Sequence, residues 1–206
     1  IGSAGHESNA ALAAALRPTD PALLHYRSGG FYQARAAQVE GSTPVRDVLQ
    51  GLMCSPDEPI AGGRHKVFGN AALSIIPQTS TIASHLPRAV GLAVALRRSV
   101  KLGLRTPWPE DSVVVCSFGD ASANHSTATG AINTALHTAH QGLPVPVLGD
   151  GRARPIATDP SVVGEGGDRL ERQARHDGVG TEPQQRCQVM GLTCLVGLRD
   201  QRGQRP

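Results

Sequence analysis

Aromatic residues are scarce in this chain, since Phe, Tyr and Trp together make up 3% of its 206 residues. A hydrophobic core must therefore be built from Ala, Val, Leu and Ile, and the hydrophobic content of 39% is sufficient for one. The formal net charge is only +3, and most of the surplus Arg lies late in the chain without interleaved aromatic residues. A nucleic-acid-binding surface is therefore not indicated.

Paired cysteines and long apolar runs are also missing. The four cysteines form no Cys-x-x-Cys pair, so a zinc site is not expected. No charged start is followed by an apolar signal core, and no apolar run is long enough to span a bilayer. We expect a soluble, cytoplasmic protein that enters no membrane. Because the chain does not begin with Met, we also expect a native N-terminal portion to be missing.

Residues 111–148 predict a strand–loop–helix–strand unit, the building block of a parallel sheet. The run VVVCSF at residues 113–118 is short and rich in β-branched residues, which is typical of a buried parallel strand. A polar loop at residues 121–127 precedes a helix that Gly142 is placed to end, and residues 145–148 start a second strand. The apolar face of the helix is predicted to consist of Ala128, Ile132, Ala135, Leu136 and Ala139. The predicted fold class is α/β, a parallel sheet flanked by helices.

Asp120 follows the first predicted strand of this unit, at the edge of a parallel sheet where ligands collect. Gly119 before it allows a ligand to approach the backbone closely. A carboxylate suits a hard cation such as Mg²⁺, which often bridges to a diphosphate. A loop Asp that caps the next helix has the same pattern, so the motif alone leaves both roles open.

Further helices are predicted from helix-forming residues and cap positions, over residues 10–16, 31–39, 44–53 and from 80 or 81 to 98. The last of these carries apolar side chains at every fourth position, namely Ile82, Leu86, Val90 and Val94. Gly91 inside it predicts close packing against another element.

Tyr26 and Arg27 are adjacent and precede two glycines. The planar guanidinium offers donors that suit phosphate oxygens, and a tyrosine hydroxyl can donate beside it. Taken alone, the pair is better explained by a surface Arg and a core Tyr at the start of a helix. We predict an ordinary core or surface position for each histidine near these motifs, which are His6, His25, His65 and His85.

Four short motifs occur in a fixed order, GHE at residues 5–7, YRSGG at 26–30, STIASHLPRAVG at 80–91 and FGDASAN at 118–124. This order resembles the α subunit of the thiamine-diphosphate-dependent dehydrogenase component of 2-oxo acid dehydrogenase complexes. That family includes the pyruvate and branched-chain 2-oxo acid enzymes. The resemblance covers residues 1–148, and four modest motifs in register make it more specific than any one of them.

The resemblance implies a role for residues in each half of the cofactor site. Tyr26 and Arg27 match a pair that contacts the cofactor diphosphate. Ser80 and Ile82 match a small and an aliphatic residue that lie against the aminopyrimidine, and the aliphatic one holds thiamine in its bent form.

The metal–diphosphate motif of the family begins at Gly119 and Asp120, so Asp120 is implied to ligate Mg²⁺. The backbone at Ala121 and Ser122 is implied to meet the diphosphate. Ala121 replaces a residue that is usually Gly in the family, which is a mild departure.

The resemblance also implies a reaction and partners. The reaction is the oxidative decarboxylation of a 2-oxo acid with acyl transfer to a lipoyl group, and most of its chemistry belongs to the cofactor. The implied partners are a β subunit, which supplies the other wall of the cofactor site in an α₂β₂ heterotetramer, and the lipoyl-bearing acyltransferase of the complex. The sequence does not name the 2-oxo acid.

The resemblance stops after Leu148, where the family has an apolar strand ending and an Asn that ligates the metal. Residues 149–206 contain no Asn, Phe, Tyr, Trp or Lys and are crowded with Gly, Arg, Gln and Asp, so they are predicted to have little order. We predict a family domain over residues 1–148 and a non-family tail, which a shifted reading frame or a divergent linker would explain. Asp150 matches a second metal motif, but no strand–helix context supports that role.

Two alternatives therefore stay open. A transketolase-like thiamine-dependent enzyme is opposed by the Tyr-Arg pair that precedes the Ser-Thr-Ile segment. An inactive remnant or interaction module of the same fold is favoured by the missing Asn.

Overall fold

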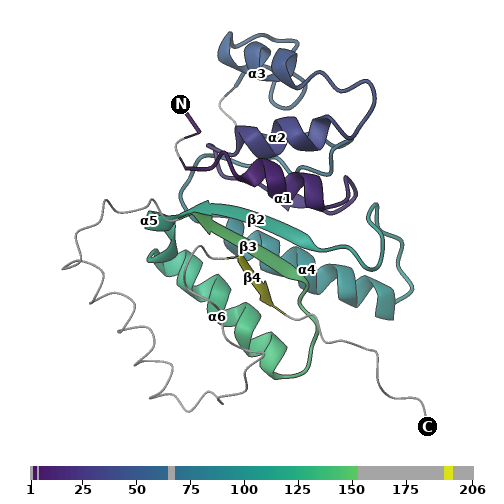
Figure 1. Cartoon of the computed structure of the whole chain (residues 1–206). Helices are drawn as coiled ribbons and strands as arrows, with labels where there is room; N and C mark the ends of the chain where they lie inside the picture. Colours follow the sequence, from purple (N-terminus) through teal and green to yellow (C-terminus); the bar gives the residue numbers. More distant parts are fainter. Residues whose placement is uncertain (1, 4, 65–67, 153–192, 197–206) are drawn as a thin grey trace, which may run out of the picture.

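The computed structural model describes residues 2–3, 5–64, 68–152 and 193–196. A four-stranded sheet lies between two layers of helices, with α1 and α2 over one face and α4 and α6 over the other (Figure 1). The predicted α/β class is therefore confirmed.

The sheet has the strand order β1-β2-β3-β4. The strands are β1 (Ala22–Leu23), β2 (Val114–Gly119), β3 (Val147–Arg152) and β4 (Thr193–Val196). The first three are parallel, and β4 pairs antiparallel with β3. Thus β3 begins two residues later than the predicted strand start and crosses the boundary predicted at residue 148. The origin of the tail stays a prediction, and most of the tail lies outside the described residues.

The central strand β2 is buried at all six positions because helices cover both faces of the sheet. Val115 packs with residues of α1 and α2, whereas Val114, Cys116 and Phe118 pack with α4 and α6. This alternation explains why the strand is a continuous apolar run in the sequence.

The predicted helices are present with shifted ends. They are α1 (Asn9–Ala15), α2 (Gly29–Ala36), α3 (Pro44–Leu52), α4 (His85–Lys101) and α6 (Ser126–His140), and the short helix α5 (Asp120–Ala123) was not predicted. Pro44 begins its helix as predicted, where its missing N–H costs least. In the part of the chain that the structure describes, no helix combines the length and apolar character needed to cross a membrane.

The start of α4 differs from the prediction. The helix begins at His85, because Ala83 adopts a left-handed φ of +61° that no helix accommodates. Ile82 therefore precedes the helix, and its side chain is 53% exposed. Leu86 and Val90 are buried as predicted, whereas Val94 is exposed. The close packing predicted at Gly91 is wrong, since no atom lies within 4 Å of a Cβ built there.

The segment after β2 also differs from the prediction. The first residues of the predicted loop form the short helix α5, and α6 packs through Ala128, Ala131 and Ala135. Ile132 and Leu136, predicted in the buried face, are exposed. Small side chains are used here because α6 lies close against α4.

A buried polar network joins α1, the turn before α2 and β2. The Asn9 side-chain amide donates to Ser28 Oγ at 3.2 Å and to Ser117 Oγ at 2.9 Å. The two serine hydroxyl oxygens lie 3.0 Å apart. All three residues are fully buried, so these hydrogen bonds replace those that the same polar groups make to water in the unfolded chain.

We expect Asn9→Ala to lower the free energy of unfolding by about 2 kcal/mol, because two buried hydroxyls lose their shared donor. Urea denaturation followed by circular dichroism measures this. The matched control is Asn133→Ala on the exposed surface of α6, which should change stability by no more than about 0.5 kcal/mol. Equal effects of the two variants would contradict a structural role for the network.

Candidate functional site

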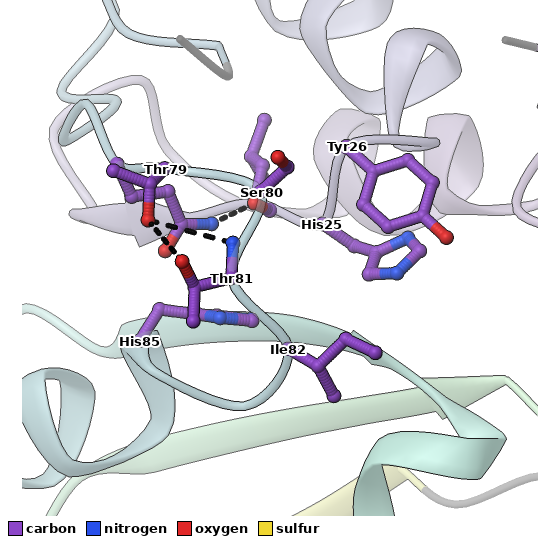
Figure 2. A pocket seen from close by; sticks show the side chains of 9 residues that line it. His25, Tyr26, Thr79, Ser80, Thr81, Ile82 and His85 are labelled. Atoms are coloured by element: carbon purple, nitrogen blue, oxygen red, sulfur yellow. Dashed lines mark hydrogen bonds between the residues drawn. The ribbon is translucent and has the colours of Figure 1, made fainter. Parts of the chain in front are cut away.

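A small pocket lies between the segment that follows β1 and the loop that precedes α4 (Figure 2). Three predicted site residues, Tyr26, Ser80 and Ile82, line it together. The other lining residues are Leu24, His25, Gln78, Thr79, Thr81 and His85. Two motifs that are distant in sequence thus meet at one surface.

The loop before α4 is held in a fixed shape by short-range hydrogen bonds. Thr79 Oγ1 donates to Thr81 Oγ1 at 3.0 Å, and Ser84 Oγ donates to the Thr81 carbonyl at 2.9 Å. Together with the left-handed Ala83, these bonds leave Ile82 exposed at the pocket. An exposed aliphatic side chain at a pocket is available to pack against a ligand.

Buried polar side chains line the inner part of the pocket. His85 Nε2 lies 2.7 Å from the Ser117 carbonyl, which can only accept, so Nε2 carries the proton. Burial is the main cause that lowers the pKa of His85, and the Arg88 charge adds to it, while the Ser117 bond opposes it. Gln78 donates through its amide to the Leu24 carbonyl. Among the described residues, His85 Nδ1 and Gln78 Oε1 have no hydrogen-bond partner.

His25 connects the pocket to β2. Its ring stacks on His6 with centroids 4.5 Å apart and lies 4.0 Å from the Tyr26 ring centroid. The Arg27 backbone N–H donates to His25 Nδ1 at 3.3 Å. Burial, followed by the charges of nearby His and Arg groups, lowers the pKa of His25 to about 4, so the ring is neutral at neutral pH.

Gly119 forms a small cradle at the carboxyl end of β2. A Cβ built on Gly119 would lie 3.3 Å from His25 Nε2 and 3.7 Å from Ser122 Oγ. Ser122 is buried, whereas Asp120 and Ala121 are exposed. The absence of a side chain at residue 119 therefore lets His25 Nε2 and Ser122 Oγ lie close to the backbone, next to the exposed Asp120 carboxylate.

A family model described as the dehydrogenase E1 component matches residues 1–145. The chain belongs to this family. The match confirms the resemblance drawn from the four motifs, and it ends just before β3. The dehydrogenase E1 components are thiamine-diphosphate-dependent parts of 2-oxo acid dehydrogenases.

Arg27 does not line the pocket beside Tyr26, and neither do the predicted site residues at positions 119–122. The Arg27 guanidinium donates to the Gly2 carbonyl at 2.8 Å and lies 5.2 Å from the centroid of the Tyr26 ring. The bond to the Gly2 carbonyl uses one of the five N–H donors of the guanidinium, so the others can still serve a phosphate.

Asp120 brings a single carboxylate to the predicted metal position of this E1 chain. Within the described ranges, no group of three or more His, Cys, Asp or Glu side chains is arranged to hold a metal ion. Asp150 lies in the interior of β3, opposite Ser117, and is 2% exposed. It is therefore not at a strand end, as a second metal motif would require.

Six pocket residues were not predicted as site residues, and three of them have buried polar side chains, namely His25, Gln78 and His85. His25 and His85 are buried, so the predicted core position is right, but their places at the pocket were missed. The available signal for His85 was its position inside the motif at residues 80–91, whereas His25 only precedes the motif at residues 26–30. His65 lies outside the described residues.

We expect the free energy of unfolding to fall as the pH drops from about 6.5 to about 4, because the unfolded chain then binds protons that buried His25 and His85 do not. The neutral rings contribute their full stabilisation at a pH above the pKa of histidine in the unfolded chain. This contribution is lost as the pH falls toward the lower pKa of each histidine in the folded protein. His85→Gln removes one titrating group and should make this fall shallower. His140→Gln, at an exposed position of α6, is the control and should keep the wild-type slope. Identical slopes for all three proteins would refute this prediction.

Proposed function

We propose that this chain is the N-terminal part of the α subunit of a thiamine-diphosphate-dependent 2-oxo acid dehydrogenase, and that it supplies one wall of the cofactor site. The supporting observation is that Tyr26, Ser80 and Ile82 line one pocket that His25 connects to the Gly119 cradle. The reaction is the oxidative decarboxylation of a 2-oxo acid with transfer of the acyl group to a lipoyl arm.

The pocket suits an amino-substituted aromatic ring such as the aminopyrimidine. Ile82 offers an exposed aliphatic surface for the face of the ring. His85 Nδ1 and Gln78 Oε1 are buried acceptors without a partner among the described residues, and an N–H donor on the ligand would satisfy them. A neutral imidazole adds no positive charge to the pocket.

The Gly119 cradle suits the diphosphate. The backbone there can be approached closely because Gly119 has no side chain, and the Ser122 hydroxyl is close enough to donate. We propose that Asp120 ligates Mg²⁺, with diphosphate oxygens and water completing the coordination shell. Tyr26 and Arg27 contact the diphosphate from the opposite side in this proposal.

The carbanion chemistry of the reaction is supplied by the thiamine cofactor when it is bound. The residues of this chain orient and shield it. Ile82 supports the bent form of thiamine, and buried His85 and Gln78 keep water from the inner part of the pocket. The Gly119 cradle, Ser122 and Asp120 position the diphosphate end.

The pocket is open on one side, which supports a shared site. More than half of the Ile82 side chain is exposed. We propose that a β subunit covers this open side in an α₂β₂ assembly, and that the lipoyl group of the acyltransferase reaches the site along the same interface.

An inactive remnant of the fold is the second candidate. Two observations favour it. Residues 149–206 contain no Asn to serve as the family's second protein ligand, and the described residues include no group of three or more His, Cys, Asp or Glu side chains that could hold a metal ion. Both features weaken Mg²⁺ binding.

Isothermal titration calorimetry with thiamine diphosphate and Mg²⁺, with and without a cognate β subunit, separates the two candidates. Saturable binding that requires Mg²⁺ supports the cofactor site. If a chain shown to be folded binds no cofactor under either condition, the remnant is the correct description.

We expect Ile82→Ala to weaken thiamine diphosphate binding about 30-fold without loss of stability, since its exposed side chain becomes buried only against the ligand. Burial of an aliphatic side chain contributes about 2 kcal/mol, which corresponds to this factor. The matched control is Val45→Ala at an exposed position of α3, which should leave the affinity unchanged. An affinity loss below about threefold for Ile82→Ala would argue against a packing role.

Asp120→Asn should weaken Mg²⁺-dependent binding of thiamine diphosphate by about tenfold or more, because an amide is a poorer Mg²⁺ ligand than a carboxylate. Titrating Mg²⁺ at fixed cofactor concentration measures this. Asp57→Asn in an exposed loop is the control. Unchanged Mg²⁺ dependence in Asp120→Asn would remove Asp120 from the metal site.

A further inference from the structure

Helix α3 presents an apolar stripe to solvent. Val45, Leu49, Leu52 and Met53 are 62%, 50%, 72% and 79% exposed, and no residue of α3 is buried. At the helical spacing these four side chains fall within about 100° of the helix circumference, so they form one continuous surface, the α3 stripe. A contiguous exposed apolar surface marks a site of contact with another molecule.

The polar side of α3 holds the helix in place. Tyr32 Oη donates to Asp47 Oδ2 at 2.8 Å, and Thr43 Oγ1 donates to Asp47 Oδ1 at 3.2 Å. Tyr32 is buried, so this contact anchors α3 to the layer beneath it. Asp47 lies on the side of the helix opposite the α3 stripe. An amphipathic helix at the surface of a domain normally turns its apolar side to the core, and α3 has the reverse orientation.

The α3 stripe is separate from the candidate functional site. Helix α3 lies on the side of α2 that faces away from the sheet (Figure 1). None of its residues lines the pocket. A contact through the α3 stripe therefore uses a different surface from the proposed cofactor site.

The charges of α3 suit a second α3 helix that runs in the opposite direction. Arg46 is exposed at the edge of the α3 stripe, and the described residues give it no hydrogen-bond or ion-pair partner. The last turn of α3 contains no basic residue to offset the negative end of the helix dipole. If a two-fold axis passes near Leu49, Arg46 of each copy meets the last turn of the other, and Val45 meets Met53. The stripe is thus complementary to itself in both charge and apolar surface.

We propose that this chain self-associates through the α3 stripe, as a two-fold dimer in which two α3 helices pack antiparallel. A helix of this length spans only about 14 Å, so the pair buries less than the roughly 800 Å² per partner of a stable interface. The dimer is therefore reversible, with a dissociation constant on the order of tens of micromolar. This inference goes beyond the proposed function, because the pairing requires neither thiamine diphosphate nor a β subunit.

Sedimentation velocity of the full chain at increasing concentration, without cofactor or second subunit, measures the association. We expect a monomer–dimer equilibrium for the wild type. Leu49→Asp should weaken dimerisation at least about tenfold, because it removes apolar contact and places two carboxylates next to the two-fold axis. The matched control is Leu102→Asp at the C-cap of α4, where the leucine is 57% exposed, and this variant should dimerise as the wild type does. Circular dichroism shows whether each variant is folded.

The charge argument has its own variants. Arg46→Glu places a negative charge against the negative end of the partner helix and should weaken the dimer about tenfold, whereas Arg46→Lys should stay within about threefold of the wild type. Equal affinities of Arg46→Glu and the wild type would overturn the antiparallel arrangement.

A disulfide cross-link tests the position of the two-fold axis. In a Cys54→Ser background, Leu49→Cys brings the thiols of two copies together, and diamide oxidises them to a disulfide by accepting their two hydrogens. We expect a covalent dimer on a non-reducing gel for Leu49→Cys but not for Leu102→Cys in the same background. No cross-link for Leu49→Cys would overturn the arrangement.

Three results of the sedimentation experiment would overturn the inference. The first is a folded wild type that stays monomeric at concentrations about tenfold above the expected dissociation constant. The second is equal dimerisation of Leu49→Asp and Leu102→Asp. The third is a Leu49→Asp variant that self-associates normally but no longer binds a cognate β subunit, since the α3 stripe then belongs to that subunit. Cofactor binding is not involved in the wild-type measurement, so its failure leaves the proposed function unaffected.

Discussion

The hydrogen bonds of Asn9 hold together the parts of the chain that form the site. One side-chain amide joins α1 to Ser28, in the turn that follows His25 and Tyr26, and to Ser117 on the central strand. His85 adds a second link, because it bonds the carbonyl of the same Ser117. The pocket therefore depends on polar contacts to one residue of β2, in a region that water does not reach.

Small side chains determine how closely the layers approach around this strand. Alanines of α6 pack toward α4 and the sheet, and glycine ends β2 at the cradle. A protein with few aromatic residues can fill such a core only if the elements lie close together. The same closeness brings His25, Gly119 and Ser122 within contact distance.

The strand–loop–helix–strand unit at residues 111–148 could be predicted because short stretches of sequence indicate where its strand and helix lie. The run VVVCSF is apolar at every position, and Gly142 lies just after the last turn of α6 with a φ of +77°. The start of α4 could not be predicted, since it depends on a left-handed Ala83 held by bonds among neighbouring hydroxyls. The prediction of the buried face of α6 was wrong in part. Ile132 and Leu136 were expected to be buried because they are more apolar than alanine, but alanines pack against the core instead.

In the candidate functional site, too, some residues could be predicted from local sequence and others could not. Tyr26, Ser80 and Ile82 were predicted from motifs that each occupy one short stretch, and the structure brings the three residues to one pocket. The place of His25 could not be predicted in this way, because it depends on contact with Gly119, which is distant in sequence and adjacent in space. A contact between distant segments cannot be read from the residues on either side of it.

The open side of the pocket has a thermodynamic consequence. When one wall of a site comes from this chain and the other from a second subunit, ligand binding and subunit association become linked equilibria. Ligand then strengthens the association by the same factor by which association strengthens ligand binding. If the proposed β subunit covers the exposed Ile82, any ligand affinity measured for this chain becomes a function of the concentration of that subunit.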